Sequence, residues 1–282
     1  VFGCTIYLAM MAEGFLGYVL PYGQMSYWGA QVIISLFGAI PYIGESLELW
    51  VRGDYYISGI TISRFFALHV VALPLVLIAL VFLHLVALHE VGAGNPEGVD
   101  IEAHLDDDGV PLDSVPFFPY KVLNALVGIG VFMTVFSVIM FFFPEGGGYF
   151  IEMANFQEAN PLVTPEHIAP VWYYAPFYTM LRAVPDPLGG LVVMGSAVAI
   201  FFVVPWLDRS KVASIRYKGL YSKIALTMFA VSFITLGYLG TVGVTEIRKT
   251  MSVICTIIYF AYFLLMPIYT KYETTKVVPQ RL

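Results

Sequence analysis

The feature that most constrains this fold is a series of apolar segments, each long enough to cross a membrane. A membrane-spanning α-helix needs about 20 predominantly apolar residues. We predict such helices at residues 1–20, 61–88, 121–143, 188–207, 220–240 and 250–270. Only 12% of the 282 residues are charged, which is about half the share in an ordinary soluble domain. The sequence therefore predicts an all-α integral membrane protein that crosses the bilayer several times.

The basic residues indicate which loops face the cytoplasm. Five lysines and arginines lie in the 207–223 loop and three more follow residue 270, whereas the connections 21–58 and 144–187 hold one each. Cytoplasmic loops carry the excess of Lys and Arg. We therefore expect the 207–223 loop and the C-terminus in the cytoplasm, and the two long connections on the outer, periplasmic side. Alternation then places the acidic 91–118 loop on the cytoplasmic side.

Two connections have a composition of their own. Residues 26–54 mix aromatic and apolar side chains with Gly, Glu and Arg, which is typical of amphipathic helices that lie in the membrane interface. We predict a pair of such helices there. Residues 144–187 form a long connection rich in Pro, Gly and Tyr, and long connections are often functional.

Two histidines, His69 and His84, lie in one apolar segment that only Pro74 interrupts. Fifteen residues of helix rise roughly 22 Å, and at 3.6 residues per turn the second ring points about 60° away from the first. A histidine in a span can simply hydrogen-bond to a neighbouring helix. Two at this spacing favour axial ligation of two stacked haem irons.

Each haem would need a second axial ligand from another helix. The other histidines are His89, His104 and His167, and none lies in a different predicted span. We therefore expect the partner ligands upstream of Val1 or on another chain. Gly3 and Gly17, fourteen residues apart in the first span, could let a flat macrocycle approach the backbone, although close helix packing would explain them equally well.

Several motifs, in order along the chain, resemble those of cytochrome b from the bc1 complex. They are Gly17–Gly29, Arg64–His69, His84–Glu90, Asn160–Tyr173 and Leu181–Pro185. That family has eight membrane helices, so the resemblance implies that this chain holds the third to the eighth and lacks an N-terminal part with the partner histidines. The plastid-type relative is split after its fourth helix. Here the fourth and fifth are continuous, which favours the respiratory, bacterial type.

The resemblance divides the chain into three parts and assigns the haem ligands. Residues 1–90 would be the last section of the haem-binding four-helix part, with its third and fourth helices and the interfacial helices 26–54. Residues 91–118 would be the cytoplasmic loop, and residues 119–282 the C-terminal four-helix part with the outer quinol-site loop 144–187. His69 with Gly17 would bind the low-potential b-type haem, nearer the outer side. His84 with Gly3 would bind the high-potential haem, nearer the cytoplasm.

The family's activity is quinol–cytochrome c reduction in the respiratory chain of the bacterial inner (plasma) membrane. The resemblance implies that ubiquinol is oxidised on the outer side and a quinone is reduced on the inner side, with coupled proton translocation. The implied partners are a Rieske iron–sulfur protein, a c-type cytochrome and a second copy of the chain, with membrane lipid around them and no nucleic acid. The outer pocket would be walled by Phe15, Tyr18, Ile168, Pro170, Tyr173 and Tyr178.

The sequence departs from the family pattern at both quinone sites. The outer tetrapeptide is commonly Pro-Glu-Trp-Tyr, but Val171 replaces its glutamate here. We therefore expect Glu13 or Glu166 to take the quinol proton, and Tyr173 to be a further catalytic residue. An ionisable residue inside a span is a functional candidate, and a protonated or ion-paired glutamate is the alternative for Glu13.

The inner site lacks an aspartate that the family commonly uses, because Ala125 aligns with it. His89 and Lys121 remain as polar candidates for that site.

The spacing of the two histidines is also unusual, because many relatives have fourteen residues where this chain has fifteen. The extra residue precedes Pro74, which lacks an N–H and clashes with the preceding turn. We predict a wide or kinked turn near residues 70–74.

Two other functions remain possible from the residues alone. A transporter or channel could use histidine and glutamate as a proton relay, and it would show no haem absorption. A haem-bearing membrane anchor would have haem without an active quinol site.

Overall fold

The computed structural model describes residues 1–148 and 150–282, and within these ranges the regular structure is helical. Six helical segments are long and apolar enough to cross a membrane: Phe2–Val19, Gly59–Val91, Phe117–Phe142, Pro187–Leu207, Leu220–Thr241 and Glu246–Leu264. Each overlaps one of the six predicted spans. The predicted all-α membrane fold is therefore confirmed.

Three spans consist of a single α-helix, namely α1 (Phe2–Val19), α10 (Leu220–Thr241) and α11 (Glu246–Leu264). The third span begins with a short π-helical segment, Phe117–Lys121, and continues as α6 (Val122–Phe142). The second span joins α4 (Gly59–Ala67) to α5 (Leu73–Val91), and the fourth joins α8 (Pro187–Ala199) to α9 (Val204–Leu207). The shorter helices are α2 (Gln24–Ser35), α3 (Gly44–Arg52), α7 (Ala175–Ala183) and α12 (Met266–Tyr272).

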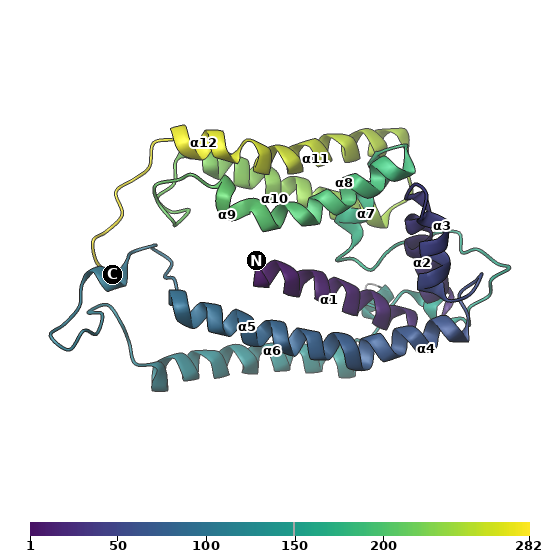
Figure 1. Ribbon diagram of the computed structural model, residues 1–282, viewed down its shortest axis with the longest axis horizontal. Helices are drawn as coiled ribbons and strands as arrows, with labels where there is room; N and C mark the ends of the chain where they lie inside the picture. The colour runs from purple at the N-terminus through teal and green to yellow at the C-terminus, as the bar shows by residue number, and fades with distance from the viewer. Residues whose placement is uncertain (149) are drawn as a thin grey trace.

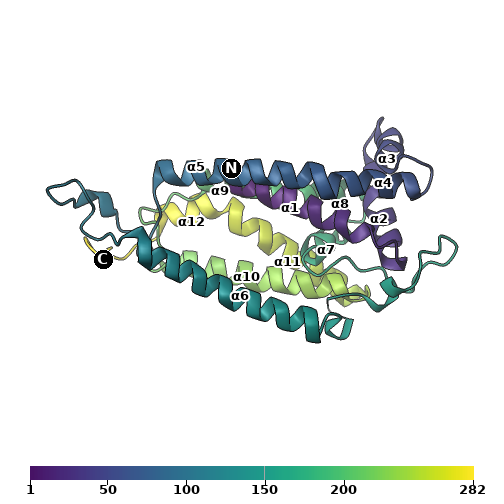
Figure 2. The ribbon, with the colours of Figure 1, turned by 90° about the horizontal axis from the view of Figure 1, so that it is seen from below.

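The spans run along the long axis of the molecule, with connections gathered at its two ends (Figures 1 and 2). α2 and α3 lie at one end with the 144–174 connection. The 92–116 loop, the 208–219 loop and the C-terminus lie at the other end. Successive connections therefore lie at alternate ends of the molecule, as the distribution of basic residues predicts.

α2 and α3 form the predicted helix pair of residues 26–54, with α2 beginning two residues earlier. α2 is tied to the 144–174 connection by hydrogen bonds. The side chain of Gln24 donates to the carbonyl of Val163 (2.9 Å) and accepts from the N–H of Asn160 (2.7 Å). Ser26 N–H donates to Asn155 Oδ1 (2.8 Å). These bonds hold the loop against the end of the bundle.

The best-packed core lies among α7, α8, α10 and α11. Met180, Leu236 and Tyr259 are fully buried there, and the Tyr259 hydroxyl donates to the carbonyl of Ala197 at 2.7 Å. α7 approaches α10 closely, because a Cβ at Gly240 would lie only 2.3 Å from the carbonyl oxygen of Ala175. α7 belongs to the 144–187 segment, which was predicted only as a connection, so residues 175–183 of that segment are helical.

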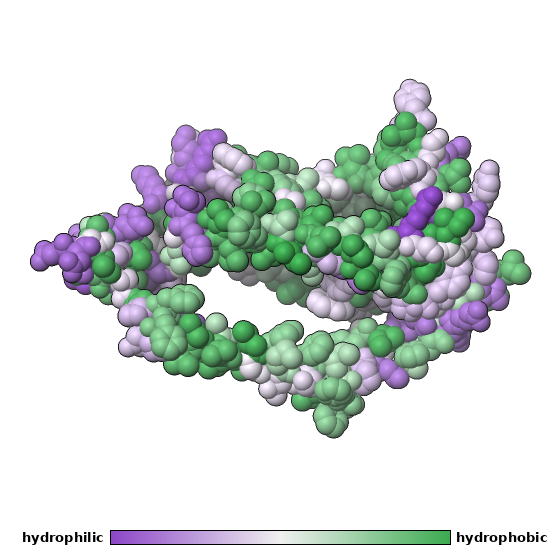
Figure 3. Space-filling view, turned by 60° about the horizontal axis from the view of Figure 1, so that its bottom comes forward, coloured by the Kyte–Doolittle hydropathy of each residue, from purple (hydrophilic) through white to green (hydrophobic). Residues whose placement is uncertain are grey.

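The opposite side of the molecule is barely packed. No residue of α5 or α6 is buried. Figure 3 shows hydrophobic side chains along the lower band of the molecule, which an open gap separates from the rest. An apolar surface of this extent must be covered by lipid or by other helices, because water does not solvate it favourably.

Candidate functional site

The segment that carries the two histidines has a π-helical turn at Leu68–Ala72. This confirms the predicted distortion, which begins two residues earlier than expected. A π turn accommodates one extra residue without ending the helix. The fifteen residues from His69 to His84 therefore advance the helix as about fourteen residues of regular α-helix would. That is also the spacing of Gly3 and Gly17 on α1.

Two of the three glycines of α1, Gly17 and Gly3, face the two histidines one to one. A Cβ added at Gly17 would lie 2.5 Å from Cε1 and 2.9 Å from Nε2 of the His69 imidazole. A Cβ added at Gly3 would lie 3.5 Å from Cε1 of His84. No side chain fits at Gly17 beside His69. At Gly3, by contrast, a methyl group would make an ordinary van der Waals contact with His84.

Glu13 lies beside the outer histidine. Its carboxylate Oε1 is 3.1 Å from Nδ1 of His69, and its backbone carbonyl oxygen is 3.0 Å from the same nitrogen. The other carboxylate oxygen, Oε2, is buried and has no hydrogen-bond partner among the described residues. The carboxylate is therefore directed at the imidazole.

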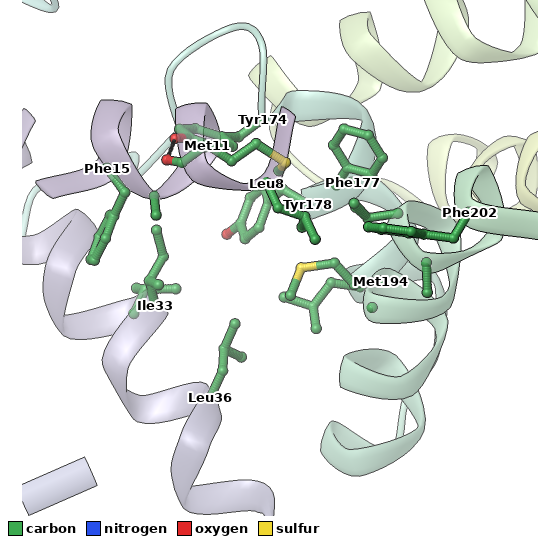
Figure 4. Close-up of a pocket in the computed structure, with 17 residues that line it drawn as sticks. Leu8, Met11, Phe15, Ile33, Leu36, Tyr174, Phe177, Tyr178, Met194 and Phe202 are labelled. Carbon is green, nitrogen blue, oxygen red and sulfur yellow. Dashed lines mark hydrogen bonds between the residues drawn. The ribbon is translucent and has the colours of Figure 1, made fainter. Parts of the chain in front are cut away.

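A large apolar cavity of about 470 Å³ lies on another side of α1. Figure 4 shows side chains from α1, the α2 region, α7 and α8 around it. Of the predicted outer-site residues, Phe15, Pro170 and Tyr178 line this cavity. Its walls also include residues that the sequence analysis missed: Met11, Ile33, Leu36, Tyr174, Phe177, Met194 and Phe202.

α1 separates this cavity from the imidazoles. Leu8, Met11, Ala12 and Phe15 line the cavity, and their spacing places them on one helical face. Gly3, Glu13 and Gly17 lie about 180° away around the same helix, given 3.6 residues per turn. One helix therefore presents a flat, glycine-lined face to the histidines and a larger apolar face to the cavity.

The remaining predicted outer-site residues lie outside the cavity wall. Tyr173 packs on Tyr174 with ring centroids 4.6 Å apart, while Tyr18 and Ile168 are partly exposed and Glu166 is exposed. The Tyr174 hydroxyl donates a hydrogen bond to the carbonyl of Met11, which joins the loop to α1. Burial raises the pKa of both Tyr173 and Tyr174. Both phenols therefore stay protonated near neutral pH and remain hydrogen-bond donors.

The predicted inner-site residues lie at the other end of the spans. His89 is in the last turn of α5 and Lys121 directly precedes α6, and both side chains are exposed. In the same region, Glu97 forms an ion pair with Arg216 and accepts a hydrogen bond from Tyr217. These contacts join the acidic loop to the basic 207–223 loop.

Among the described residues, no three His, Cys, Asp or Glu side chains come close enough together to hold a metal ion. His69, in the π-helical turn before α5, and His84, in α5, could instead each supply one ligand to a metal whose other ligands come from elsewhere. Imidazole is a usual protein ligand of haem iron, so His69 and His84 are the residues that would hold b-type haem, which would supply one-electron chemistry there. Gly17 and Gly3 carry no Cβ on the side of α1 that faces these imidazoles, so no side chain of α1 obstructs the rings at those two positions.

The fold and the site define a multi-pass, all-α membrane protein. Two imidazoles lie on one membrane span, and an apolar cavity lies on the far side of α1. Two family descriptions match it: "Cytochrome b(N-terminal)/b6/petB" over residues 1–176 and "Cytochrome b(C-terminal)/b6/petD" over residues 158–260. The chain belongs to the cytochrome b family.

Individual relatives agree with the family match. Cytochrome b of Allochromatium vinosum is 53% identical over 99% of this chain and 69% of its own length. Cytochrome b of Rickettsia prowazekii is 44% identical over 99% and 67%. A chain of a hyperthermophilic respiratory complex III superposes with a TM-score of 0.87 at 32% identity, covering 96% of this chain and 69% of that one.

This membership makes the chain the haem-bearing subunit of a quinol–cytochrome c oxidoreductase, within a multi-subunit respiratory complex. The alternative of a haem-free proton-coupled transporter is not favoured. The family implies binding of b-type haem.

Proposed function

We propose that this chain holds two b-type haems, a low-potential one at His69 and a high-potential one at His84, and that it oxidises quinol in the cavity on the far side of α1. The observation that carries this proposal is the division of α1 into two faces. One face pairs Gly17 with His69 and Gly3 with His84, and the other lines the cavity. Bound haem supplies one-electron oxidation and reduction.

The cavity suits the ring and tail of a quinol. Its volume of about 470 Å³ lies within the usual range of small-molecule sites, which are mostly apolar with a few placed polar groups. Tyr178 supplies a phenol at this wall. The guanidinium of Arg182 lies 4.4 Å from the centre of the Tyr178 ring and donates to the carbonyl of Leu239 at 2.9 Å. This cation–π contact holds the ring in position.

The proton released from quinol needs an acceptor, because Val171 supplies none. We assign this role to Glu166, with Tyr173 as a neutral hydrogen-bond donor beside it. Glu166 lies in the loop that leads from Pro170 at the cavity wall to solvent, and its side chain is exposed. Glu13, the other predicted acceptor, has its carboxylate against His69 instead.

Kinetics of quinol oxidation by the assembled complex test this assignment. We expect Glu166→Gln to slow quinol oxidation about tenfold or more and to change its pH profile, since general-base catalysis contributes at least that much. Glu158→Gln, an exposed carboxylate of the same connection, is the matched control and should leave the rate unchanged. A wild-type rate and pH profile for Glu166→Gln would reject the role. Measuring Glu13→Gln in the same assay compares the second candidate.

We propose that quinol oxidation takes place on the periplasmic side of a bacterial inner membrane, with the C-terminus in the cytoplasm. Support comes from the charge layout, which gathers the basic loop and the tail at the end opposite the cavity. The partners would be a Rieske iron–sulfur protein, a c-type cytochrome and a second copy of the chain. Ubiquinone would be reduced at the inner end near His89 and Lys121, with proton uptake there.

A redox titration of the haem absorption of the complex in its membrane tests the two-haem proposal. We expect two b-type transitions in the unmodified protein. His69→Ala should remove the low-potential transition and His84→Ala the high-potential one, because an imidazole ligand is lost in each. His104→Ala, in the 91–118 loop, is the control. Both transitions surviving in either α5 variant would refute the assignment.

A further inference from the structure

Glu13 is an acidic residue within a membrane span, and its position needs an explanation. Its side chain is only 17% exposed, and an ionisable group at such a depth is costly unless another group pairs with it. Among the described residues, the close polar partner of the Glu13 carboxylate is Nδ1 of His69, 3.1 Å away. One carboxylate oxygen, Oε2, remains buried without a hydrogen-bond partner. The carboxylate is therefore placed for the imidazole alone.

The contact fixes how the His69 ring is used. Nδ1 lies 3.1 Å from the Glu13 carboxylate and 3.0 Å from the Glu13 carbonyl, so two acceptors surround one nitrogen. Nδ1 therefore carries the ring proton and donates it. Nε2 lies on the side of Gly17, where a Cβ would come within 2.9 Å of it. Cε1 lies 2.5 Å and Nδ1 3.0 Å from the same position, so this edge of the ring faces Gly17, and Nε2 is the nitrogen left with a free lone pair.

This arrangement matches a general feature of metal-binding histidines. The ring nitrogen that does not bind the metal commonly donates to a carboxylate, which sets the tautomer, orients the ring and increases ligand basicity. An anionic acceptor does so more strongly than a neutral carbonyl, because charge-assisted hydrogen bonds are roughly twice as strong.

His84, the other histidine of this membrane span, has no such partner. Within the described part of the chain, His84 makes no hydrogen bond or ion pair, and its neighbour across the gap is Gly3. The two imidazoles therefore differ in the charge beside them, although they lie on the same helix and face glycines of the same neighbouring helix.

We propose that Glu13 is a positioning residue for the outer haem site, which holds His69 as the Nδ1–H tautomer and lowers the reduction potential of the haem bound there relative to the one at His84. This inference rests on the proposed ligand roles of the two histidines. The negative charge and the more basic imidazole both favour the oxidised, more positive iron. The chain would thus increase the difference between its two haems with one carboxylate.

The test is a redox titration of the assembled complex carrying Glu13→Gln, which keeps the shape and the amide oxygen as an acceptor but removes the charge. We expect the outer haem to become easier to reduce, by about tenfold in its redox equilibrium or ~59 mV for one electron. The inner haem, at His84, should be unchanged and serves as the internal control. Glu13→Leu removes the acceptor as well and should also change the low-temperature spectrum of the oxidised outer haem, which reports ring orientation.

The failure of this inference differs from failure of the two-haem proposal. If both haems are present and the potential of the outer haem is the same in the unmodified, Glu13→Gln and Glu13→Leu proteins, Glu13 has no such role. An equal shift at both haems would also reject it, since it would show a general effect of charge. Absence of the outer haem from the unmodified complex would instead contradict the ligand assignment itself. If Glu13→Leu does not assemble, the Glu13→Gln titration still decides.

Discussion

The two sides of the molecule are packed in opposite ways. On the α7–α11 side, Met180, Leu236 and Tyr259 are fully buried and close a core of their own. On the other side, α5 and α6 bury no residue at all. α1 lies between them, since Tyr7 meets Phe201 of the first side with ring centroids 6.1 Å apart while Gly17 faces His69 of the second. The comparison shows that one side closes a buried core, and that the other leaves an apolar surface exposed.

The largest effect should come from filling the gap between α1 and α5. Gly17→Ala places a methyl group where no Cβ fits beside the His69 ring, so the ring must move. We expect loss of most of the low-potential haem absorbance in a difference spectrum. Gly3→Ala is the matched control, because its Cβ would meet His84 at an ordinary 3.5 Å. Equal haem loss in both variants would contradict the one-to-one pairing.

Removing a side chain should lower the free energy of unfolding more on the α7–α11 side than on the α5–α6 side. Leu236→Ala removes a fully buried side chain, and such a change costs about 2–5 kcal/mol. Leu85→Ala on α5, where the side chain is 47% exposed, should cost much less. The thermal unfolding midpoint of each variant in detergent measures the difference. Similar midpoints would show that α5 is packed as firmly as α10.

Filling the cavity should impair quinol binding without disturbing the haem sites. Met194→Trp adds bulk to the cavity wall on α8. The cavity and Gly17 lie on different faces of α1. We expect the KM for quinol to rise about tenfold, which corresponds to ~1.4 kcal/mol, while the haem spectrum stays unchanged. Val192→Trp on the same helix, where the side chain is 58% exposed, is the control. A haem spectrum altered by Met194→Trp would show that the two faces of α1 are not independent.

The smallest effect should occur at the end of the molecule that holds the C-terminal tail. A hydrogen bond from Arg281 lowers the pKa of the Asp113 carboxyl below its ordinary value. The contact is therefore fully present above the ordinary pKa of about 4 and is lost as the pH falls through the lowered one. We expect limited proteolysis of the C-terminal tail to become faster over that acid range. Asp113→Asn should make the tail equally sensitive at neutral pH, and an unchanged digestion rate would contradict the contact.

The features that sequence alone predicted are those set by local pattern. Span positions follow from runs of apolar residues, and the distortion near Pro74 follows from the fifteen-residue spacing and the chemistry of proline. The pairing of Gly17 and Gly3 with the two histidines was also accessible, since both sets repeat at nearly the same interval along adjacent helices.

The features that sequence missed depend on contacts between distant segments. α7 is only nine residues long, too short to give a clear periodic signal, and its cavity residues became recognisable only when packed against α8 and α1. The contact of Glu13 with His69 was missed for the same reason. Its carboxylate was predicted as a quinol proton acceptor because it lies one turn from Gly17, but its direction is set by His69, fifty-six residues away along the chain.

One measurement tests the central claim that α1 separates the haem from the quinol. It is a density map of the assembled complex with a quinol-site inhibitor bound. We expect a macrocycle held by His69 on the Gly17 side of α1, and the inhibitor against Phe15 and Tyr178 on the other side. Inhibitor density on the His69 side of α1, or an iron bound through a residue other than His69, would contradict it.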